Sequence, residues 1–239
     1  MAFSGITSLA VATGRTLPGL YVGTSGFSYP TWRPRFYPPG ARPREFLRLY
    51  AERLPTVELN ATFYRLPSEE QLAAWAEQTP PSFRFAVKMS RRITHEGRLE
   101  LVPTFCEGVR ALGERLGPIL VQLPPSRQRD DGLLSLYLGS LDPELRYAFE
   151  FRHPSWEEAD LCAHARVGSL EPAAGLLYLR LRETPYDEAR LDELAGRLRP
   201  LVDAGVEVYA YFKHEEEPSA PLYAQRLLQL TTQNAPSSC

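Results

Sequence analysis

The amino-acid sequence predicts a single α/β domain with the architecture of a TIM-like β/α barrel, and three observations support this fold class. Short apolar or alternating runs recur along the chain, each bounded by Pro, Gly or polar turns. Helix-like stretches separate most of these runs, so the strands are expected to be parallel and joined by crossovers. The length of 239 residues suits one barrel, which typically needs ~250 residues.

The predicted elements follow one another along most of the chain. Strands are expected at 20–24, 56–60, 84–89, 119–123, 147–152, 176–181 and 206–212. Helices are expected at 43–54, 68–78, 104–117, 187–205 and 220–230. The pattern therefore divides the chain into a loose N-terminal leader (1–19), a single barrel domain (20–230) and a disordered tail (231–239).

The sixth β/α unit is predicted to be shortened or missing. Only 23 residues lie between Arg152 and Leu176, where a regular barrel would place a helix, a strand and another helix. Two arrangements are compatible with this length. Either residues 161–165 form a stub of strand six, or the barrel is open or seven-stranded at this point.

Composition narrows the classes of partner and cofactor. With 27 basic and 29 acidic residues, the net charge of -2 gives no reason to expect nucleic acid or an anionic membrane as a partner. The three cysteines are odd in number and far apart, and the four histidines lie on separate segments, so no disulfide framework, metal site or cofactor is expected. A reducing cytoplasm is the default location. Residues 1–19 lack the regions of a signal peptide, and no run of ~18 apolar residues is present, so no membrane span is expected.

Alternation along the strands brings ionisable side chains to the barrel axis. Side chains of a strand point alternately to the helices and to the axis. The predicted inward set is polar: Glu58, Asn60, Lys88, Gln122, Glu150, Arg152, Arg180, Arg182 and Lys213. Most of them lie late in their strands, at the end where barrel active sites are built. Because unpaired buried charges cost several kcal/mol, these groups must pair with one another, face water or meet a ligand.

The inward set suggests an anion site. Lys88, Arg152 and Arg180 would hold the phosphate or carboxylate of a small molecule such as a sugar derivative, and Glu58 or Glu150 would transfer a proton. An enzyme of this kind would be a metal-independent isomerase, lyase or hydrolase acting on a small anionic molecule. The alternative is a structural ion-pair network of the same acids and bases that fixes the register of the barrel.

Two histidines and an aromatic loop add further candidates. His95 and His153, which follow the third and fifth predicted strands, are candidate proton shuttles. Tyr29 and Trp32 lie in the Gly- and Pro-rich segment 23–40 and are expected either to stack on a sugar or base or to plug the barrel end. The same arginine-rich segment makes nucleic-acid binding or processing an alternative function, with a steep salt dependence. The full set of ligand-binding candidates is Ser25, Tyr29, Trp32, Asn60, Tyr64, Lys88, Gln122, Arg152, Trp156, Arg180, Arg182 and Lys213.

Ordered motifs from about residue 20 to 230 resemble the domain of unknown function 72 family, also called YecE-like. The motifs are GTSGFSYPTW with FYPPG, VELNATFYRLPS, FRFAVKMSRRITH, LGPILVQLPPS, FEFRHPSW, YLRLR and VYAYF. The resemblance implies a TIM-like barrel whose activity is unassigned.

Two departures from the family pattern bear on function. The family usually has His-Gly and Asn-Asn pairs where this chain has Arg182-Glu183 and Lys213-His214. The region after Trp156 is also shorter than in the family. This shortening makes a non-catalytic ligand sensor or a degenerate paralogue a third alternative. The oligomeric state stays open.

Overall fold

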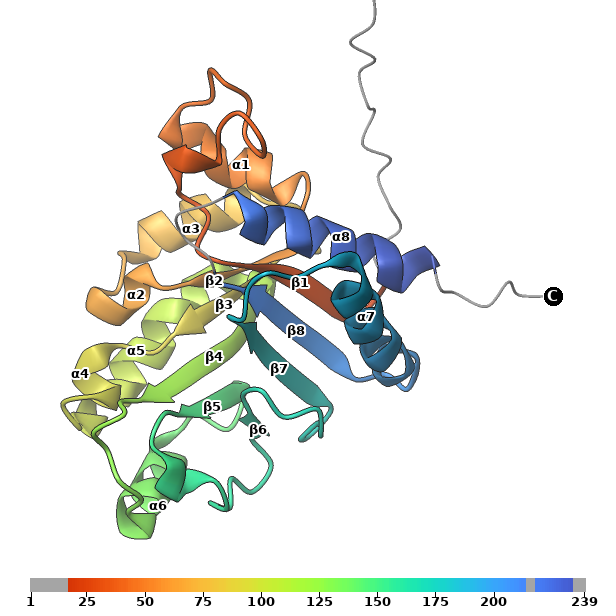
Figure 1. The fold of residues 1–239 in the computed structure, drawn as a ribbon. Coiled ribbons are helices and arrows are strands. Elements are labelled where there is room, and N and C mark those ends of the chain that lie inside the picture. Colours follow the sequence, from red (N-terminus) through yellow and green to blue (C-terminus); the bar gives the residue numbers. More distant parts are fainter. Residues whose placement is uncertain (1–16, 214–217, 234–239) are drawn as a thin grey trace, which may run out of the picture.

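Eight parallel strands form one curled sheet, and helices cover its outer surface (Figure 1). The structure, a computed structural model, describes residues 17–213 and 218–233. Neighbouring strands follow the order β6-β5-β4-β3-β2-β1-β8-β7. This is the strand order of a barrel in which β6 and β7, the two ends of the sheet, do not pair with each other. The predicted TIM-like barrel is therefore confirmed, and most of the predicted leader and tail (1–16 and 234–239) lies outside the described residues.

Every predicted strand is present. The strands are β1 Leu20–Ser25, β2 Thr56–Leu59, β3 Arg84–Lys88, β4 Leu116–Leu123, β5 Tyr147–Phe151, β6 Ala165–Arg166, β7 Leu176–Leu181 and β8 Glu207–Phe212. The largest difference is at β4, which begins three residues before the predicted position. There Leu116 already pairs with Phe85 of β3.

The α-helices lie between the strands. They are α1 Phe46–Ala51, α2 Ala61–Tyr64, α3 Glu69–Glu77, α4 Arg91–Thr94, α5 Val102–Val109, α6 Asp131–Ser140, α7 Glu188–Asp203 and α8 Ser219–Gln233. Short 3-10 helices are η1 Pro30–Trp32, η2 Pro43–Glu45, η3 Leu99–Leu101, η4 Arg110–Arg115 and η5 Pro154–Trp156. Helix α8 extends to Gln233, so residues 231–233 are helical where the sequence predicts a tail.

Local chemistry explains where several helices begin and end. The Ser68 hydroxyl accepts from the Gln71 amide at the start of α3, and Asp187 accepts from the Arg190 amide at the start of α7. The single helix predicted at 104–117 is divided into α5 and η4 and ends before β4. Gly113 has a φ of 57°, which an α-helix does not allow.

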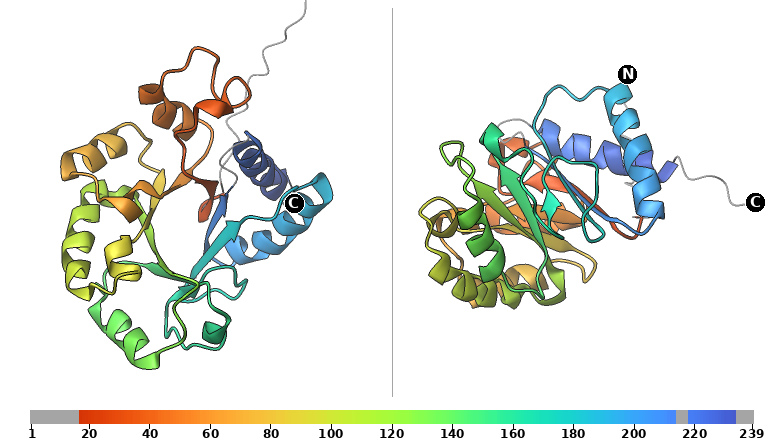
Figure 2. Two further views of the ribbon diagram at one scale, coloured as in Figure 1. Left: turned by 60° about the vertical axis from the view of Figure 1, so that its left-hand side comes forward. Right: turned by 90° about the horizontal axis from the view of Figure 1, so that it is seen from below.

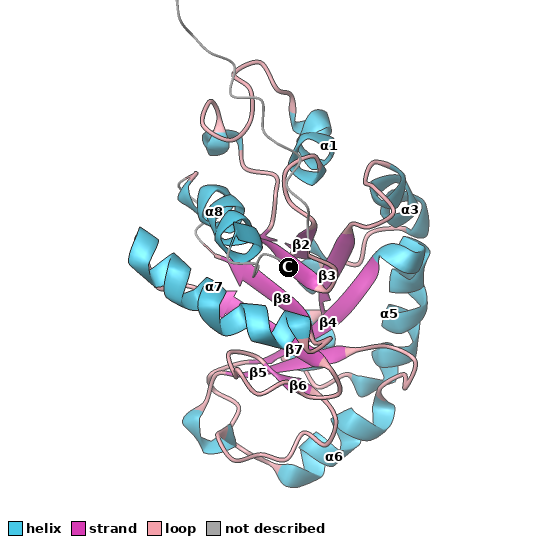
Figure 3. Cartoon of the chain, turned by 90° about the vertical axis from the view of Figure 1, so that its right-hand side faces the viewer, coloured by secondary structure: helices cyan, strands magenta, loops and turns pink. Residues whose placement is uncertain are grey.

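The sixth unit is shortened, as the sequence predicts. Strand β6 has two residues and pairs with β5 through Ala148 and Phe149. No α-helix occurs between β5 and β7 in the described chain, and Figure 3 shows loops beside β6. The Gly168 amide donates to the Tyr178 carbonyl at 3.0 Å, and this bond connects the β6 side of the opening to β7.

The lower half of the barrel interior is apolar. Tyrosines from β7 and β8 fill the space beside alanines from β3, β5 and β6, so large and small side chains complement one another. The interior cluster consists of Ala86, Leu120, Ala148, Ala165, Leu176, Tyr178, Tyr209 and Tyr211. Helices surround the strands (Figure 2), and a larger apolar core lies between the two. Among the described residues, no helix has the length and apolar character needed to cross a membrane.

Candidate functional site

Polar side chains fill the barrel at the carboxyl ends of its strands. Six of them form one buried layer above the tyrosines: Ser25, Glu58, Lys88, Gln122, Glu150 and Arg180. Strand alternation places these residues inward, because each lies on the same face as an interior residue two positions earlier. Asn60, Arg152, Arg182 and Lys213 follow in the same alternation at the mouth.

Arg180 connects the two acids of the layer. Its Nη2 lies 2.8 Å from Glu58 Oε1, and its Nη1 lies 2.7 Å from Glu150 Oε2. The Arg180 side chain is only 2% exposed. Burial by itself would lower the pKa of Arg180, but the charges of Glu58 and Glu150 outweigh burial and raise it. The three residues form a structural ion-pair network across β2, β5 and β7.

Glu58 does not reach the mouth. Its side chain is 0% exposed, and both carboxylate oxygens have partners. Oε1 accepts from the Ser25 hydroxyl (2.6 Å) in addition to Arg180, and Oε2 accepts from the Tyr178 hydroxyl (2.8 Å). The carboxylate of Glu58 is therefore enclosed below the mouth, and its catalytic role stays a prediction.

Glu150 lies closer to the mouth but is also fully engaged. Its oxygens accept from Gln122 Nε2 (2.7 Å) and from Arg180 and Arg182, and Arg152 Nε lies 3.9 Å away. Burial would raise the pKa of Glu150, but Arg180 and Arg182 outweigh it, so the pKa is lowered. Glu150 stays ionised at neutral pH. It is suited to orienting arginines more than to exchanging a proton.

The pKa of Lys88 is shifted toward neutral pH. Its Nζ donates to Gln122 Oε1 at 2.8 Å and lies 3.8 Å from the centre of the Phe63 ring. Burial, followed by the charge of Arg180, lowers the pKa of Lys88 to about 8. A group with this pKa gains and loses a proton easily near physiological pH.

The two candidate histidines have different surroundings. The His95 ring packs against Phe63, and its Nδ1 lies 2.9 Å from the Thr94 hydroxyl. Burial and then the charge of Lys88 lower the pKa of His95, so this ring is neutral at pH 7. His153 instead caps η5, where its Nδ1 accepts from the Ser155 amide at 3.2 Å. His95 thus belongs to the surroundings of Lys88, whereas His153 has a local structural contact.

Two arginines at the mouth are accessible. The side chains of Arg152 and Arg182 are 44% and 34% exposed, and both are directed toward Glu150. The Nε atoms of Arg180 and Arg182 are buried and have no hydrogen-bond partner among the described residues. With Lys88 and Lys213, the described part of the mouth carries more basic than acidic side chains.

The aromatic candidates form two groups. Trp32 and Trp156 are buried, at 1% and 0% exposure, so their rings face the protein interior, and a ligand contact of either stays a prediction. Trp156 stacks on Phe151 and donates to the Arg127 carbonyl (2.7 Å), while Trp32 packs within the aromatic loop. Tyr64, by contrast, is 73% exposed.

Residues of the aromatic loop pack on helix α1. The Tyr37 ring stacks on Phe46 of α1 with centroids 4.3 Å apart. Tyr29 donates to the Ser25 carbonyl at 3.1 Å, and Asn60 Nδ2 donates to the Ser25 hydroxyl at 2.7 Å. Most of this loop therefore fits the alternative in which its aromatic residues plug the barrel end. Ser25 lies within the polar layer, and Asn60 lies at its rim.

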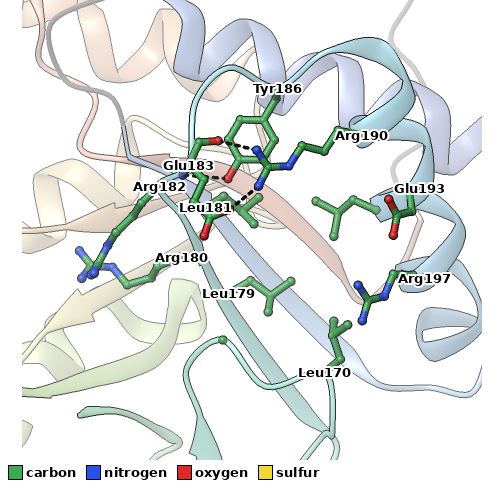
Figure 4. A pocket seen from close by; sticks show the side chains of 12 residues that line it. Leu170, Leu179, Arg180, Leu181, Arg182, Glu183, Tyr186, Arg190, Glu193 and Arg197 are labelled. Atoms are coloured by element: carbon green, nitrogen blue, oxygen red, sulfur yellow. Dashed lines mark hydrogen bonds and ion pairs between the residues drawn. The ribbon is translucent and has the colours of Figure 1, made fainter. Parts of the chain in front are cut away.

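A cavity of about 520 Å³ lies beside β7, and Arg180 and Arg182 belong to its lining. It is lined in part by Leu170, Leu179 and Tyr186, and it lies where the sixth unit has no helix. Figure 4 shows Arg180 and Arg182 turned to one side of β7 and Leu179 to the other, toward α7. The lining of this cavity therefore shares Arg180 and Arg182 with the polar layer and the barrel mouth.

Two contacts of the site were not predicted from the sequence. Tyr178 holds Glu58 from below, and the Phe63 ring covers Lys88. Tyr178 precedes Arg180 by two positions on the same face, so alternation was the available signal. Phe63 lies in α2, a short helix that the strand pattern does not indicate.

Within the described ranges, no group of three His, Cys, Asp or Glu side chains is arranged to hold a metal ion.

The arrangement of the strands agrees with the comparison to known proteins. Residues 21–238 match the family described as "Protein of unknown function DUF72". The chain belongs to the DUF72 family. A DUF72 family protein from Thermotoga maritima has a similar solved structure, with a TM-score of 0.75, 25% identity, and coverage of 88% of this chain and 98% of that one. One from Enterococcus faecalis gives a TM-score of 0.74 at 18% identity, covering 89% and 95%.

Curated relatives carry no activity in their names. The chain is 33% identical over 142 residues to the UPF0759 protein YecE of Escherichia coli K12, covering 57% of this chain and 50% of the relative. It is 24% identical over 149 residues to the UPF0759 protein YunF of Bacillus subtilis, covering 57% and 52%. The chain spans about half the length of these curated relatives.

Proposed function

We propose that the barrel mouth binds a small anionic molecule through a phosphate or carboxylate group. The observation that carries this proposal is the excess of cations around the ion-pair network. Five basic side chains (Lys88, Arg152, Arg180, Arg182 and Lys213) accompany two carboxylates (Glu58 and Glu150) in the described part of the site. The two acids balance part of this charge, and an anionic ligand would balance the rest.

Arg152 and Arg182 are the side chains that would contact the anion. Both are partly exposed, and a guanidinium group offers paired donors that match the geometry of phosphate and carboxylate. Their shared neighbour Glu150 orients them from below without closing the mouth. The deeper Glu58–Arg180–Glu150 network has the role of a rigid support.

Chemistry at this site would be metal-independent acid/base chemistry centred on Lys88 and His95. Lys88 titrates near neutrality and His95 is neutral at pH 7, whereas both acids are held in ion pairs. We thus assign proton transfer to Lys88 and His95, whereas the sequence suggested Glu58 or Glu150. Isomerase, lyase and hydrolase reactions all use such groups.

We also propose a cytoplasmic location for the protein, since Cys106 and Cys162 are free thiols.

Anion binding is tested by calorimetric titration and thermal unfolding with inorganic phosphate, pyrophosphate and oxalate. We expect binding that stabilises the wild-type protein and weakens about tenfold or more in Arg182→Ala, because a hydrogen bond to a charged group is lost. Arg42→Ala is the matched control, since Arg42 is 62% exposed and pairs with Glu45 away from the mouth. Absence of binding by the wild-type protein, or equal weakening in both variants, would refute the proposal.

The nucleic-acid alternative is separated in the same experiment. A single-stranded oligonucleotide that binds with a steep salt dependence and is not displaced by phosphate would favour it over a small ligand. The buried position of Trp32 in the arginine-rich loop removes one reason for this alternative. We therefore expect weaker binding of the oligonucleotide than of pyrophosphate at physiological salt.

A further inference from the structure

The distribution of lysine in this chain is unusual. The sequence contains 27 Lys and Arg residues, and all of them except Lys88 and Lys213 are arginine. Both lysines come to the barrel mouth. Lys88 is the last residue of β3, and Lys213 follows the last residue of β8, where its amide donates to the Leu181 carbonyl. The two lysine side chains of the sequence thus lie at the barrel mouth, and the other 25 Lys or Arg positions are arginine.

An amine differs from a guanidinium group in one chemical respect that matters here. Arginine stays protonated in proteins, whereas a buried lysine can lose its proton and become a nucleophile. Arginine would also bring more donors than the neighbours of Lys88 can satisfy, since Nζ makes one hydrogen bond, to Gln122, and faces the Phe63 ring. A lysine here fits both a small space and a chemical role.

The surroundings of Lys88 lower its pKa, and the residue remains partly accessible to a ligand. The residue keeps 9% of its surface exposed. Burial, Arg180 and Lys213 lower the pKa of Lys88, and the carboxylates of Glu58 and Glu150 oppose them. With a pKa of about 8, roughly one molecule in ten carries the free amine at pH 7. The positive charge of Lys213 is one of the factors that lower the pKa of Lys88, and Lys213 acts on Lys88 in this way.

We propose that Lys88 forms an imine with the carbonyl carbon of an anionic oxo compound, such as an oxo acid or a phosphorylated sugar. This inference rests on the anion site proposed above. Arg152 and Arg182 would hold the phosphate or carboxylate, and the carbonyl carbon would lie at Lys88. Lys213 is a positioning residue, since it is argued to act through Lys88.

The reaction balances without a further reagent. The neutral Nζ adds to the carbonyl carbon, forming the N–C bond while the C=O π bond breaks, and the oxygen takes up a proton in exchange for one that the nitrogen releases, which gives a carbinolamine. The C–O bond then breaks, and the hydroxyl group leaves as water with the second proton released by the nitrogen, so that amine and carbonyl compound give an imine and one water molecule. No electron is gained or lost. Protonated, the imine carries a positive charge that withdraws electrons from the neighbouring carbon.

The test is reductive trapping, and the scarcity of lysine makes it unambiguous. The full-length protein is incubated with pyruvate or glyceraldehyde 3-phosphate and sodium cyanoborohydride, and the adduct is located by peptide mass spectrometry. Only Lys88, Lys213 and the N-terminal amine can react. We expect at least tenfold more adduct on Lys88 than on the other two amines. Equal labelling of all amines, or no adduct with either probe, would overturn the proposal.

Variants separate the amine from a structural lysine. Lys88→Arg keeps the charge and should lose the adduct while still binding phosphate, with its fold checked by thermal unfolding. Lys213→Ala should keep the site of labelling but slow it at pH 7, with the optimum shifted to higher pH. A purely structural Lys88 would give no labelling to lose, and an unchanged pH profile in Lys213→Ala would refute the role of Lys213.

The outcome also distinguishes this proposal from the anion site. Phosphate binding without trapping would reject the imine and leave the anion site intact. Trapping of uncharged propionaldehyde on Lys88, with no preference for pyruvate and no phosphate binding, would support the reactive amine and reject the anion site. We expect Arg182→Ala to reduce labelling by pyruvate about tenfold and to leave labelling by propionaldehyde unchanged.

Discussion

Arg180 is the residue on which the polar layer depends. It contacts Glu58 and Glu150 at the same time, and its side chain is almost completely buried. Burying a charge is expensive, and removing one partner of a buried ion pair leaves the other charge without compensation. Arg182, two positions later, contacts only the outer oxygen of Glu150 and stays partly exposed.

Substitution of these two arginines is therefore expected to have very different effects on stability. Arg180→Met leaves two buried carboxylates without their shared cation and should lower the free energy of unfolding by about 3–5 kcal/mol. Arg182→Met removes a partly exposed contact and should cost about 1 kcal/mol or less. Urea denaturation of both variants at pH 7 measures the difference. Equal effects would show that the network does not support the fold.

The sequence predicted the direction of these side chains but not their depth. Alternation along each strand correctly placed Glu58 and Glu150 on the inward face, because the strand fixes that periodicity. Whether an inward acid meets a ligand depends on how far it lies from the mouth and which neighbours reach it. Those neighbours come from strands distant in sequence, such as Tyr178 for Glu58. For this reason the proposed proton-transfer role falls on Lys88, whereas the sequence suggested Glu58 or Glu150.

At the scale of elements, helix α1 is linked to the first two strands by one hydroxyl group. Tyr50 of α1 accepts from the Thr24 amide at 2.8 Å and donates to the Thr56 carbonyl at 2.9 Å. Gly23 leaves room for this contact, since a Cβ there would lie 2.0 Å from the Thr56 oxygen and 2.9 Å from the Tyr50 hydroxyl. The close approach of β1, β2 and α1 thus requires glycine.

Gly23→Ala is expected to destabilise the protein by about 3 kcal/mol or more, since the clash is with backbone and a buried hydroxyl group. Gly196→Ala is the matched control. Gly196 is exposed within α7, and no described atom lies within 4 Å of the position that its Cβ would take, so alanine should stabilise the helix by about 0.5–1 kcal/mol. Thermal unfolding of both variants gives the comparison, and similar midpoints would contradict it.

The elements were predictable where local signals and length agreed. Helices α3 and α7 and the shortened sixth unit follow from the sequence, the last one because 23 residues cannot hold a helix, a strand and a second helix. Helix α6 was not predicted, although Asp130 caps it. Its apolar residues occur on several faces, and Leu136 is 64% exposed, so the helical period is weak.

At the scale of the whole molecule, the barrel interior is divided into two environments. Tyrosines and alanines make an apolar lower half, and charged residues with excess cations make the upper half. The apolar half below and the helices outside limit the access of water to the charged layer, which strengthens its electrostatic interactions. Lys88 lies in the charged layer, so its pKa in the folded barrel differs from its pKa in the unfolded chain.

The stability of the protein is expected to depend on pH through Lys88. The pKa of Lys88 is about 8 in the folded protein and near 10.4 in an unfolded chain. Below pH 8 both states hold the proton, so the cost of burying the ammonium group is fully present. Between pH 8 and about 10 the folded state has lost the proton while the unfolded state retains it, so stability rises with pH in this window.

Tyrosines limit the window from above. Burial raises the pKa of Tyr178 and Tyr211, so the unfolded chain ionises first above pH ~10 and stability then falls. We expect the free energy of unfolding of the wild-type protein, relative to Lys88→Met, to increase by on the order of 2 kcal/mol between pH 7 and 9.5. Urea denaturation across this range measures the difference. Because Lys88→Met retains the tyrosines, parallel curves for the two proteins would show that Lys88 has an ordinary pKa and would also remove the electrostatic support for its reactivity.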